Sequence, residues 1–272
     1  MKIFILSGLV LFAITTALAQ DQMVPRKKGD FYFYWGYNRA LYSHTNIKFS
    51  GPGYEFEISD VSAIDKPLSF SFENYFKLTN ISIPQYVYRV GYFITDKWSV
   101  SLGMDHMKYV MNQNQTVKIN GTINEPNNPY NGTYVDDDIV LTPAFLEFEH
   151  TDGLNYLNAS ADYYYDIYTN PTQSFTISAF GGGGIGMLIP KSNVVLMSSE
   201  RNDQFHIAGY GFHGDLGLNF SFWRHLFFRS QLKGGFVHLP DVLTRPGGVP
   251  DRANHGFWFG MWDFALGWQW SF

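Results

Sequence analysis

The chain has 272 residues, of which 18% are aromatic, 16% are charged and none is cysteine, and its formal net charge is −5. The absence of cysteine excludes a fold held together by disulfides. The acidic balance, with no basic run beyond Arg26 to Lys28, argues against nucleic acid as a partner.

The first residues, "MKIFILSGLVLFAITTALAQ", have the features of an export signal. A basic start at Lys2 precedes an apolar run over residues 3–14, and Ala17 and Ala19 then form a small-x-small cleavage pattern. The apolar run is too short to span a membrane. We therefore predict a secretory signal peptide over residues 1–19 and one mature domain over 20–272. The alternative interpretation is a buried N-terminal helix.

The rest of the chain alternates apolar and polar residues with the period of two that is typical of β-strands. Many of these segments match the roughly 9–11 residues of a tilted membrane-spanning strand rather than the roughly five or six of a soluble one. No later stretch of 18 or more apolar residues predicts a spanning helix. The eight predicted strands are 30–38, 85–94, 98–109, 157–167, 175–190, 210–222, 227–236 and 258–272.

Short and long connections alternate between these strands. The short ones are 95–97, 168–172 and 223–225, and the long ones are 39–82, 110–154, 189–206 and 239–256. This alternation is typical of a transmembrane up-and-down β-barrel, with short turns on one side and long extracellular loops on the other.

The long connections contain further candidate strands at Tyr54–Ser59, Thr116–Ile123 and Val140–His150. We interpret them as hairpins that project above the membrane, which leaves an eight-stranded antiparallel barrel. If these connections instead cross the bilayer, the barrel has ten or twelve strands.

A secreted β-sandwich would also show period two, but it would expose its polar face. Here the polar face is thin and rich in glycine, and the other face carries Trp and Tyr near the strand ends, as at a membrane interface. In lipid a closed barrel pairs every backbone group. We predict that the polar face lines the interior, with a network made of Arg89, Asp105, Asp162, Asp215, Arg229, Lys233 and Asp263.

A narrow eight-stranded barrel is filled by its side chains. We therefore interpret the charged network as a structural core, with a conducting lumen as the alternative. The run Gly181–Gly184 is expected to let the sheet curve or to let a large neighbour lie over it.

The final residues, "GWQWSF", resemble the C-terminal signal of outer-membrane β-barrels: Gly267, then Trp270 two positions before the end, then the terminal Phe272. Ala265 is a small departure, because that position is usually polar. With the signal peptide and eight strands, the mature chain resembles small Gram-negative barrels of the OmpA/OmpX type and is porin-like. The resemblance implies outer-membrane localisation, contact with lipid and lipopolysaccharide, and recognition by the barrel assembly machinery.

Small barrels of this type include enzymes, so we considered catalytic groups. His106, Glu149 and His150 are candidates at the outer rim. His106 and His150 could meet there, and a histidine with a carboxylate could act as a general base. Ser160 is a possible nucleophile, but no elbow motif surrounds it. A solvated polar rim is the alternative. Asp136, Asp137 and Asp138 predict a solvated acidic loop, since they lack the spacing of a calcium loop. We expect no metal and no cofactor.

Three functions remain open. The sequence favours a non-enzymatic outer-membrane barrel with a structural role or a surface-binding role through its long extracellular loops. The alternatives are a lipid A-modifying hydrolase, deacylase-like, and a narrow passive pore. The sequence does not name the extracellular ligand.

Overall fold

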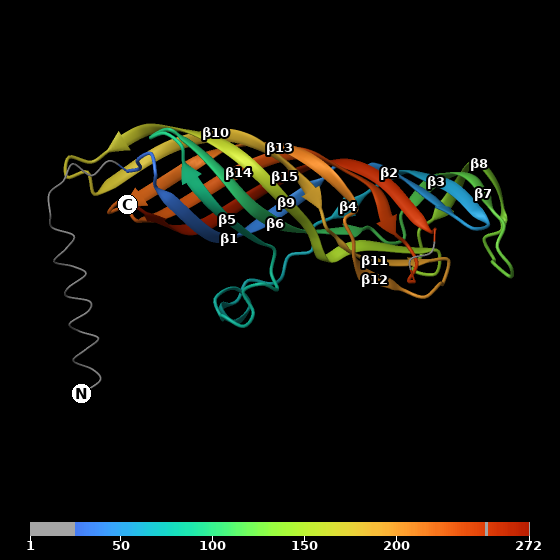
Figure 1. Ribbon diagram of the computed structural model, residues 1–272. Helices are drawn as coiled ribbons and strands as arrows, with labels where there is room; N and C mark the ends of the chain where they lie inside the picture. Colours follow the sequence, from blue (N-terminus) through green and yellow to red (C-terminus); the bar gives the residue numbers. More distant parts are fainter. Residues whose placement is uncertain (1–24, 248–249, 272) are drawn as a thin grey trace.

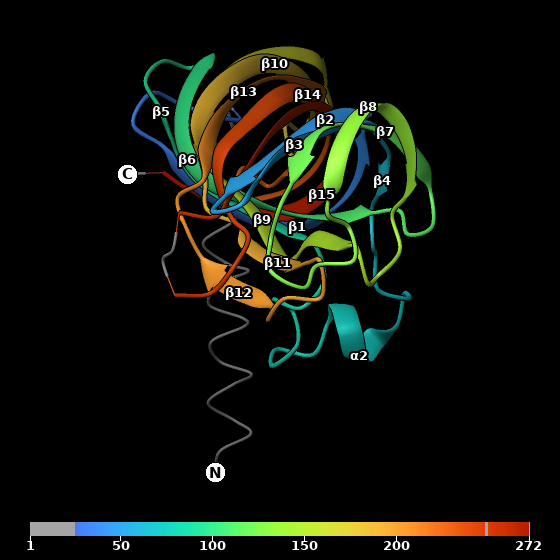
Figure 2. The same cartoon turned by 90° about the vertical axis from the view of Figure 1, so that its right-hand side faces the viewer.

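The computed structural model describes residues 25–247 and 250–271. The predicted signal peptide and Phe272 lie outside these residues. Eight antiparallel strands form a ring that closes because β1 pairs with both β5 and β15 (Figures 1 and 2). The eight strands are β1 (Phe31–Tyr42), β5 (Tyr86–Phe93), β6 (Trp98–Met111), β9 (Leu146–Thr169), β10 (Phe175–Leu188), β13 (Gly209–Phe222), β14 (Leu226–Leu243) and β15 (Arg252–Trp270).

The predicted eight-stranded antiparallel barrel is confirmed. The interpretation of residues 140–150 as one strand of a projecting hairpin is wrong, because Leu146–His150 is the outer end of β9. The register of β6 with β9 shifts between Met107 and Tyr109, and Gly153 has a φ of 133°. This irregularity interrupts the alternation in the sequence and makes one long strand look like two segments.

Side chains alternate between the two faces of the ring over most of its strands, with irregular stretches near the outer end of β6 and β9. On β15 the outward Trp258 and Leu266 are both 58% exposed, whereas the inward Asp263 is 1% exposed. A water-soluble protein would bury the apolar face, so this arrangement is the one expected for a barrel surrounded by lipid chains. We take the spanning segments as the parts with apolar outward side chains: 31–37, 86–94, 98–104, 157–168, 175–187, 210–222, 226–236 and 258–270.

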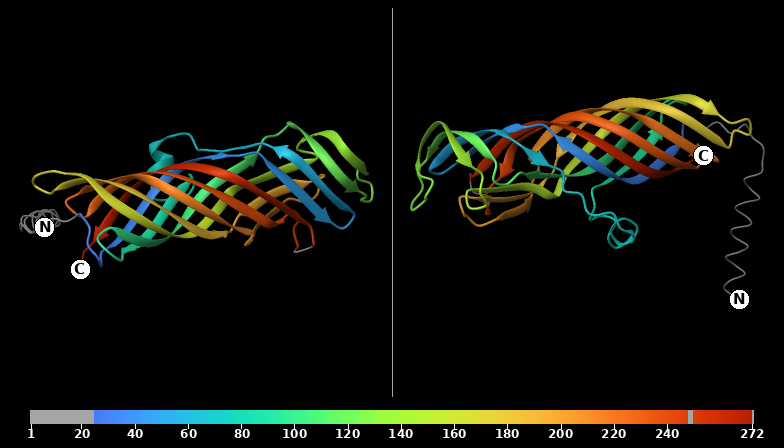
Figure 3. Two further views of the ribbon diagram at one scale, coloured as in Figure 1. Left: turned by 90° about the horizontal axis from the view of Figure 1, so that it is seen from above. Right: turned by 180° about the vertical axis from the view of Figure 1, so that it is seen from behind.

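Beyond the outer end of the ring the sheet continues as an extension of four strands, which we call the projecting sheet. It consists of β2 (Thr45–Gly51), β3 (Tyr54–Val61), β7 (Thr116–Ile123) and β8 (Gly132–Val140). β2 pairs with the outer end of β15, and β8 is the last strand in the order β15-β2-β3-β7-β8 (Figures 1 and 3). Short strands β11 (Lys191–Leu196) and β12 (Asn202–Phe205) extend β9, and β4 (Ala63–Ile64) pairs with β6.

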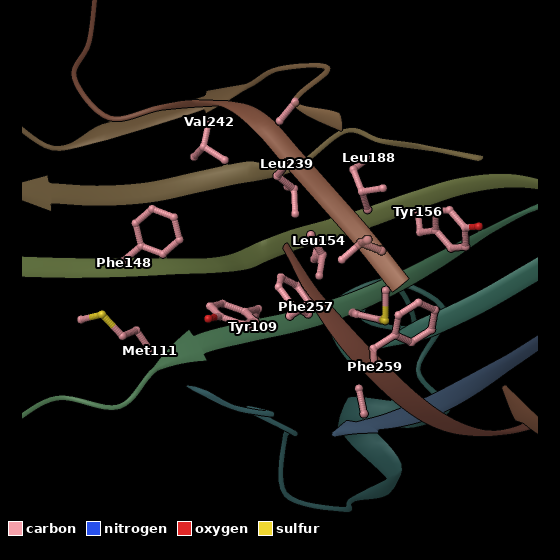
Figure 4. Packing of buried hydrophobic residues seen from close by; sticks show 14 of the residues in the cluster. Tyr109, Met111, Phe148, Leu154, Tyr156, Leu188, Leu239, Val242, Phe257 and Phe259 are labelled. Carbon is pink, nitrogen blue, oxygen red and sulfur yellow. The ribbon is translucent and has the colours of Figure 1, made fainter. Parts of the chain in front are cut away.

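An apolar core fills the outer end of the barrel and the base of the projecting sheet. Phe49, Phe56 and Phe148 are almost completely buried there, with Phe49 and Phe56 stacked at 5.1 Å between ring centroids. Figure 4 shows the part of this core around Tyr109, Phe148 and Phe257. The molecule thus has a polar interior within the membrane and an apolar interior above it.

The one helix in the described residues, α2 (Phe72–Tyr75), belongs to the connection between β4 and β5. The Ser71 hydroxyl accepts a hydrogen bond from the Asn74 amide and caps its first turn. No helix among the described residues is long and apolar enough to span a membrane.

Candidate functional site: barrel interior and outer end

The first group of interior charges centres on Asp105. Lys233 Nζ lies 2.6 Å from Asp105 Oδ2, and Arg89 Nη2 lies 3.9 Å from Oδ1. Arg89 also donates hydrogen bonds to Asn158 and Ser160. All these side chains are buried, so each charge is matched by a partner rather than by water.

The second group centres on Arg229, which is 1% exposed. Its guanidinium donates to Asp162 at 2.9 Å, Tyr164 at 2.7 Å and Gln231 at 3.0 Å. The guanidinium carbon lies 3.5 Å from the centroid of the Phe180 ring. Asp162 and Tyr164 lie on β9, whereas Arg229 and Gln231 lie on β14, so the guanidinium links two strands that are not neighbours in the ring.

The remaining two predicted network residues have weaker contacts. Asp215 lies 3.6 Å from His213 Nε2, and the Asp263 Oδ1 atom has no hydrogen-bonding partner among the described residues. Both carboxylates point inward and are buried. All seven predicted residues are therefore buried in the interior. Five of them form two ion-paired groups, and Asp215 and Asp263 belong to neither.

Little space remains in the interior near the periplasmic end. A cavity lined by residues that include Arg26, Tyr32 and Gln269 has a volume of about 10 Å³, which is about that of one water molecule. The glycine run contributes to this packing, because a Cβ on Gly184 would lie 2.7 Å from both His213 and Ser160. The prediction that a large neighbour lies over this run holds for Gly184.

We expect that the purified protein, inserted into a planar bilayer in 1 M salt, gives no discrete conductance steps. The ion pairs and the apolar core above them leave no continuous water path. A bona fide pore inserted under the same conditions serves as the positive control. Reproducible unitary steps that scale with salt concentration would contradict a filled barrel.

Ser160 and His213 lie together inside the ring. Ser160 Oγ is 3.1 Å from His213 Nε2, and Asp215 Oδ2 is 3.6 Å from the same nitrogen. A catalytic triad of the Ser-His-Asp type needs the carboxylate at the other ring nitrogen, Nδ1. In this protein Tyr156 Oη, not a carboxylate, lies 3.0 Å from His213 Nδ1. This arrangement is therefore a polar packing contact, and the sequence analysis did not place His213 in it.

The proposed catalytic histidines have different partners. His106 Nδ1 lies 2.8 Å from Asn155 Oδ1, and its ring stacks on Tyr86 at 4.7 Å. His150 instead faces His255, with 3.5 Å between their Nε2 atoms, and its Nδ1 lies 2.9 Å from Ser192 Oγ. The hydrogen bonds thus do not link His106 to His150.

His150 and His255 lie above the spanning segments in the apolar core. Burial lowers the pKa of His150 from its ordinary 6.5 to about 3. Burial and the neighbouring His150 lower the pKa of His255 well below its ordinary range. Tyr109 packs against both rings, and burial raises the pKa of its hydroxyl. Both imidazoles are neutral at physiological pH and inaccessible to a substrate.

Glu149 is held on the outside of the same region. Its carboxylate accepts hydrogen bonds from Asn193 at 2.8 Å and Thr151 at 3.1 Å, and Lys66 Nζ lies 3.5 Å away. His255, Ser192 and Tyr109 were missed by the sequence analysis. His255 could have been found, because it shares the parity of the inward-facing Asp263 on β15.

The acidic run lies on β8, at the free edge of the projecting sheet. Asp136, Asp137 and Asp138 are all exposed, and Asp138 lies 2.9 Å from Lys118 Nζ. Across residues 25–247 and 250–271, no group of three or more acidic, histidine or cysteine side chains is arranged to hold a metal ion.

No protein-family model matches the sequence, and no curated protein matches it either. Solved structures are similar in fold. The outer membrane protein OprG from Pseudomonas aeruginosa has a TM-score of 0.39 and 12% identity, over 92% of this chain and 100% of OprG. Neisserial surface protein A has a TM-score of 0.38 and 12% identity, over 90% and 100%. Ail of Yersinia pestis has a TM-score of 0.34 and 9% identity, over 89% of this chain and 99% of Ail.

The chain is a closed eight-stranded β-barrel of the kind that spans a membrane. The closed ring, the apolar outward face and the polar interior together meet the requirements of a protein that crosses a bilayer with strands. The described N-terminal and C-terminal ends lie at the same end of this barrel, opposite the projecting sheet (Figure 1).

The last strand of this barrel carries the predicted assembly signal. Trp270 is 45% exposed on the outward face and pairs with Phe31 of β1, which closes the ring. Gly267 faces inward under the Phe227 ring, where a Cβ would lie 2.1 Å from the ring carbon. Recognition of Gly267, Trp270 and Phe272 by the assembly machinery stays a prediction.

Proposed function

We propose that this outer-membrane barrel uses the projecting sheet as a surface-binding module for a cationic extracellular ligand. The barrel would serve as its anchor. The observation that carries the proposal is the charge of the sheet. Residues 45–61 and 116–140 contain seven acidic side chains and two lysines, a net charge of −5 (2 minus 7).

The two lysines are already paired. Lys48 Nζ lies 2.6 Å from Glu55, and Lys118 lies 2.9 Å from Asp138. Among residues 25–247 and 250–271, Asp136 and Asp137 have no ion pair, and both side chains are exposed. A cluster of one sign at the end of a surface projection attracts oppositely charged partners and speeds their encounter.

The construction of the sheet also favours binding. Its inner strands are held by the buried Phe49, Phe56 and Ile58, whereas most residues of β8 are exposed on both faces. Among the described strands β8 pairs with β7 alone, so its other edge is open to an extended segment that adds as a further strand. Because the same edge is acidic, a second copy of this strand is repelled and a basic segment is attracted.

We expect the purified barrel in lipid nanodiscs to bind a fluorescent oligolysine peptide and not a matched oligoglutamate peptide. The triple variant Asp136→Asn, Asp137→Asn, Asp138→Asn should bind about tenfold more weakly, since each exposed charge contributes on the order of 0.5 kcal/mol. Fluorescence anisotropy measures both affinities, and higher salt should weaken the binding to the unmodified protein.

The matched control is Glu147→Gln with Glu200→Gln, two exposed carboxylates on the other side of the outer end. This variant should keep the affinity of the unmodified protein. If oligolysine does not bind, or if both variants lose affinity equally, the projecting sheet is not the binding surface.

A further inference from the structure

The connection between β4 and β5 carries large apolar side chains that the rest of the described chain leaves exposed. Leu78 is 85% exposed, Phe70 is 77% exposed and Phe72 is 76% exposed. Phe76 and Ile83 add to them at 56% and 52%. Isolated exposed apolar residues are ordinary, but a cluster of this size marks a surface that meets another apolar phase.

The segment is ordered within itself. The Tyr75 side chain is 4% exposed, and its hydroxyl donates to the Leu68 carbonyl at 2.9 Å. The rings of Phe72 and Phe76 stack at 5.5 Å between centroids. Because Tyr75 alone is turned toward the protein, the neighbouring phenylalanines are turned outward.

Tyr75 fastens this segment to the outward face of the barrel. Tyr37 Oη donates to the Tyr75 carbonyl at 2.5 Å, and the two rings meet at 4.9 Å. Arg39 Nη2 donates to Tyr75 Oη at 2.7 Å. Tyr37 and Arg39 continue the outward-facing row of β1 that begins at Phe31, so the segment adjoins the lipid-facing surface.

Figures 1 and 3 show where this places α2. The segment leaves the barrel sideways, whereas the projecting sheet continues beyond its outer end. Both ends of the segment are tied to the barrel: the Ala40 amide donates to Asp65 at 3.1 Å, and Lys108 Nζ donates to the Ile83 carbonyl at 3.0 Å.

The contacts of Arg39 indicate what surrounds the segment. A guanidinium on the outward face of a membrane barrel is costly beside hydrocarbon. Here it donates to the Asn38 carbonyl and to Tyr75 Oη, and it lies 5.8 Å from the centroid of the Tyr75 ring. The segment thus supplies a hydrogen-bonding partner to a guanidinium that stays exposed at the edge of the apolar wall, and it presents phenylalanines beside it.

We propose that residues 65–84 form an interfacial anchor, which inserts its exposed apolar side chains among the acyl chains of the outer leaflet. Phe72, Phe76 and Leu78 are its central contacts. The occupant is lipid because the patch is continuous with the surface of the barrel that already faces lipid. The anchor adds apolar contact with the outer leaflet next to the base of the projecting sheet.

The absence of cysteine allows a direct test. Spin labels at Phe72→Cys and Leu78→Cys are compared in reconstituted liposomes with a lipid-facing reference at Leu232→Cys and a water-facing reference at Val135→Cys. Leu232 and Val135 are 55% and 77% exposed. Collision rates with oxygen and with a water-soluble nickel complex report the depth of each label, and heat-modifiable gel migration confirms folding.

We expect both segment labels to resemble Leu232, with high oxygen collision and low nickel collision. Labels that resemble Val135, with free access of nickel, overturn the proposal. Labels that are shielded from both reagents also overturn it, because they indicate that protein rather than lipid covers the segment. Two label positions keep the test decisive if one variant does not fold.

Discussion

Replacing Arg229 with alanine is expected to destabilise the barrel by about 3–5 kcal/mol. The change removes the hydrogen bonds to Tyr164 and Gln231 and leaves the Asp162 carboxylate buried without its ion-pair partner. Breaking a buried pair by removing one partner is costly because the other charge stays desolvated. Urea-induced unfolding in lipid vesicles, followed by tryptophan fluorescence, measures the difference.

Lys97→Ala is the matched control, because Lys97 is an exposed basic residue in the short turn between β5 and β6. A change within about 0.5 kcal/mol is expected there. If Arg229→Ala also stays within that range, the interior is hydrated enough to replace the guanidinium with water, and a structural role for the network is wrong.

Acidification is expected to loosen the outer end of the molecule through His150 and His255. The folded state holds both imidazoles neutral, so the unfolded state binds more protons at low pH. The contribution of His150 to stability is complete above pH 6.5 and is lost progressively as the pH falls toward about 3, and protonation of His255 acts in the same direction. At pH 4.5 the loss from His150 alone is about 3 kcal/mol.

This loss can be measured as faster amide hydrogen exchange at the outer ends of β9 and β15. Exchange rates are compared between pH 7 and 4.5 after correction for the intrinsic pH dependence of exchange. His150→Gln should flatten the dependence, because an amide keeps hydrogen-bonding capacity and does not titrate in this range. His44→Gln is the control, since His44 is exposed beside Asp60. Equal slopes in all three proteins would rule out the buried pair as the origin.

The strand number, and the face to which each side chain points, could be predicted from the sequence because period two is a local property. The pattern on β15, with Trp258 and Trp262 opposite Asp263, identifies the outward and inward faces without any knowledge of neighbours. The same pattern placed Arg89, Arg229 and Lys233 on the inner face.

The pairing of these residues could not be predicted in the same way. Lys233 and Asp105 are 128 positions apart, and their 2.6 Å contact depends on the stagger of strands around the closed ring. A shift of one residue in the register of one strand would turn its charges outward. His106 and His150 looked equivalent in the sequence, but the shift between Met107 and Tyr109 gives them different neighbours.

The sequence alone indicated a barrel that crosses a membrane and favoured eight strands over ten or twelve, because alternation and strand length depend on neighbouring residues. The three-dimensional structure was needed to fix the strand number at eight, to show how far the sheet continues beyond the bilayer, and to identify the ion pairs in the interior and the position of residues 65–84. These features depend on contacts between residues far apart in the chain, and closure of the β1–β15 pair sets the register that brings them together. The aromatic end of β15 pairs with β1, where Trp268 and Trp270 lie opposite Phe33 and Phe31.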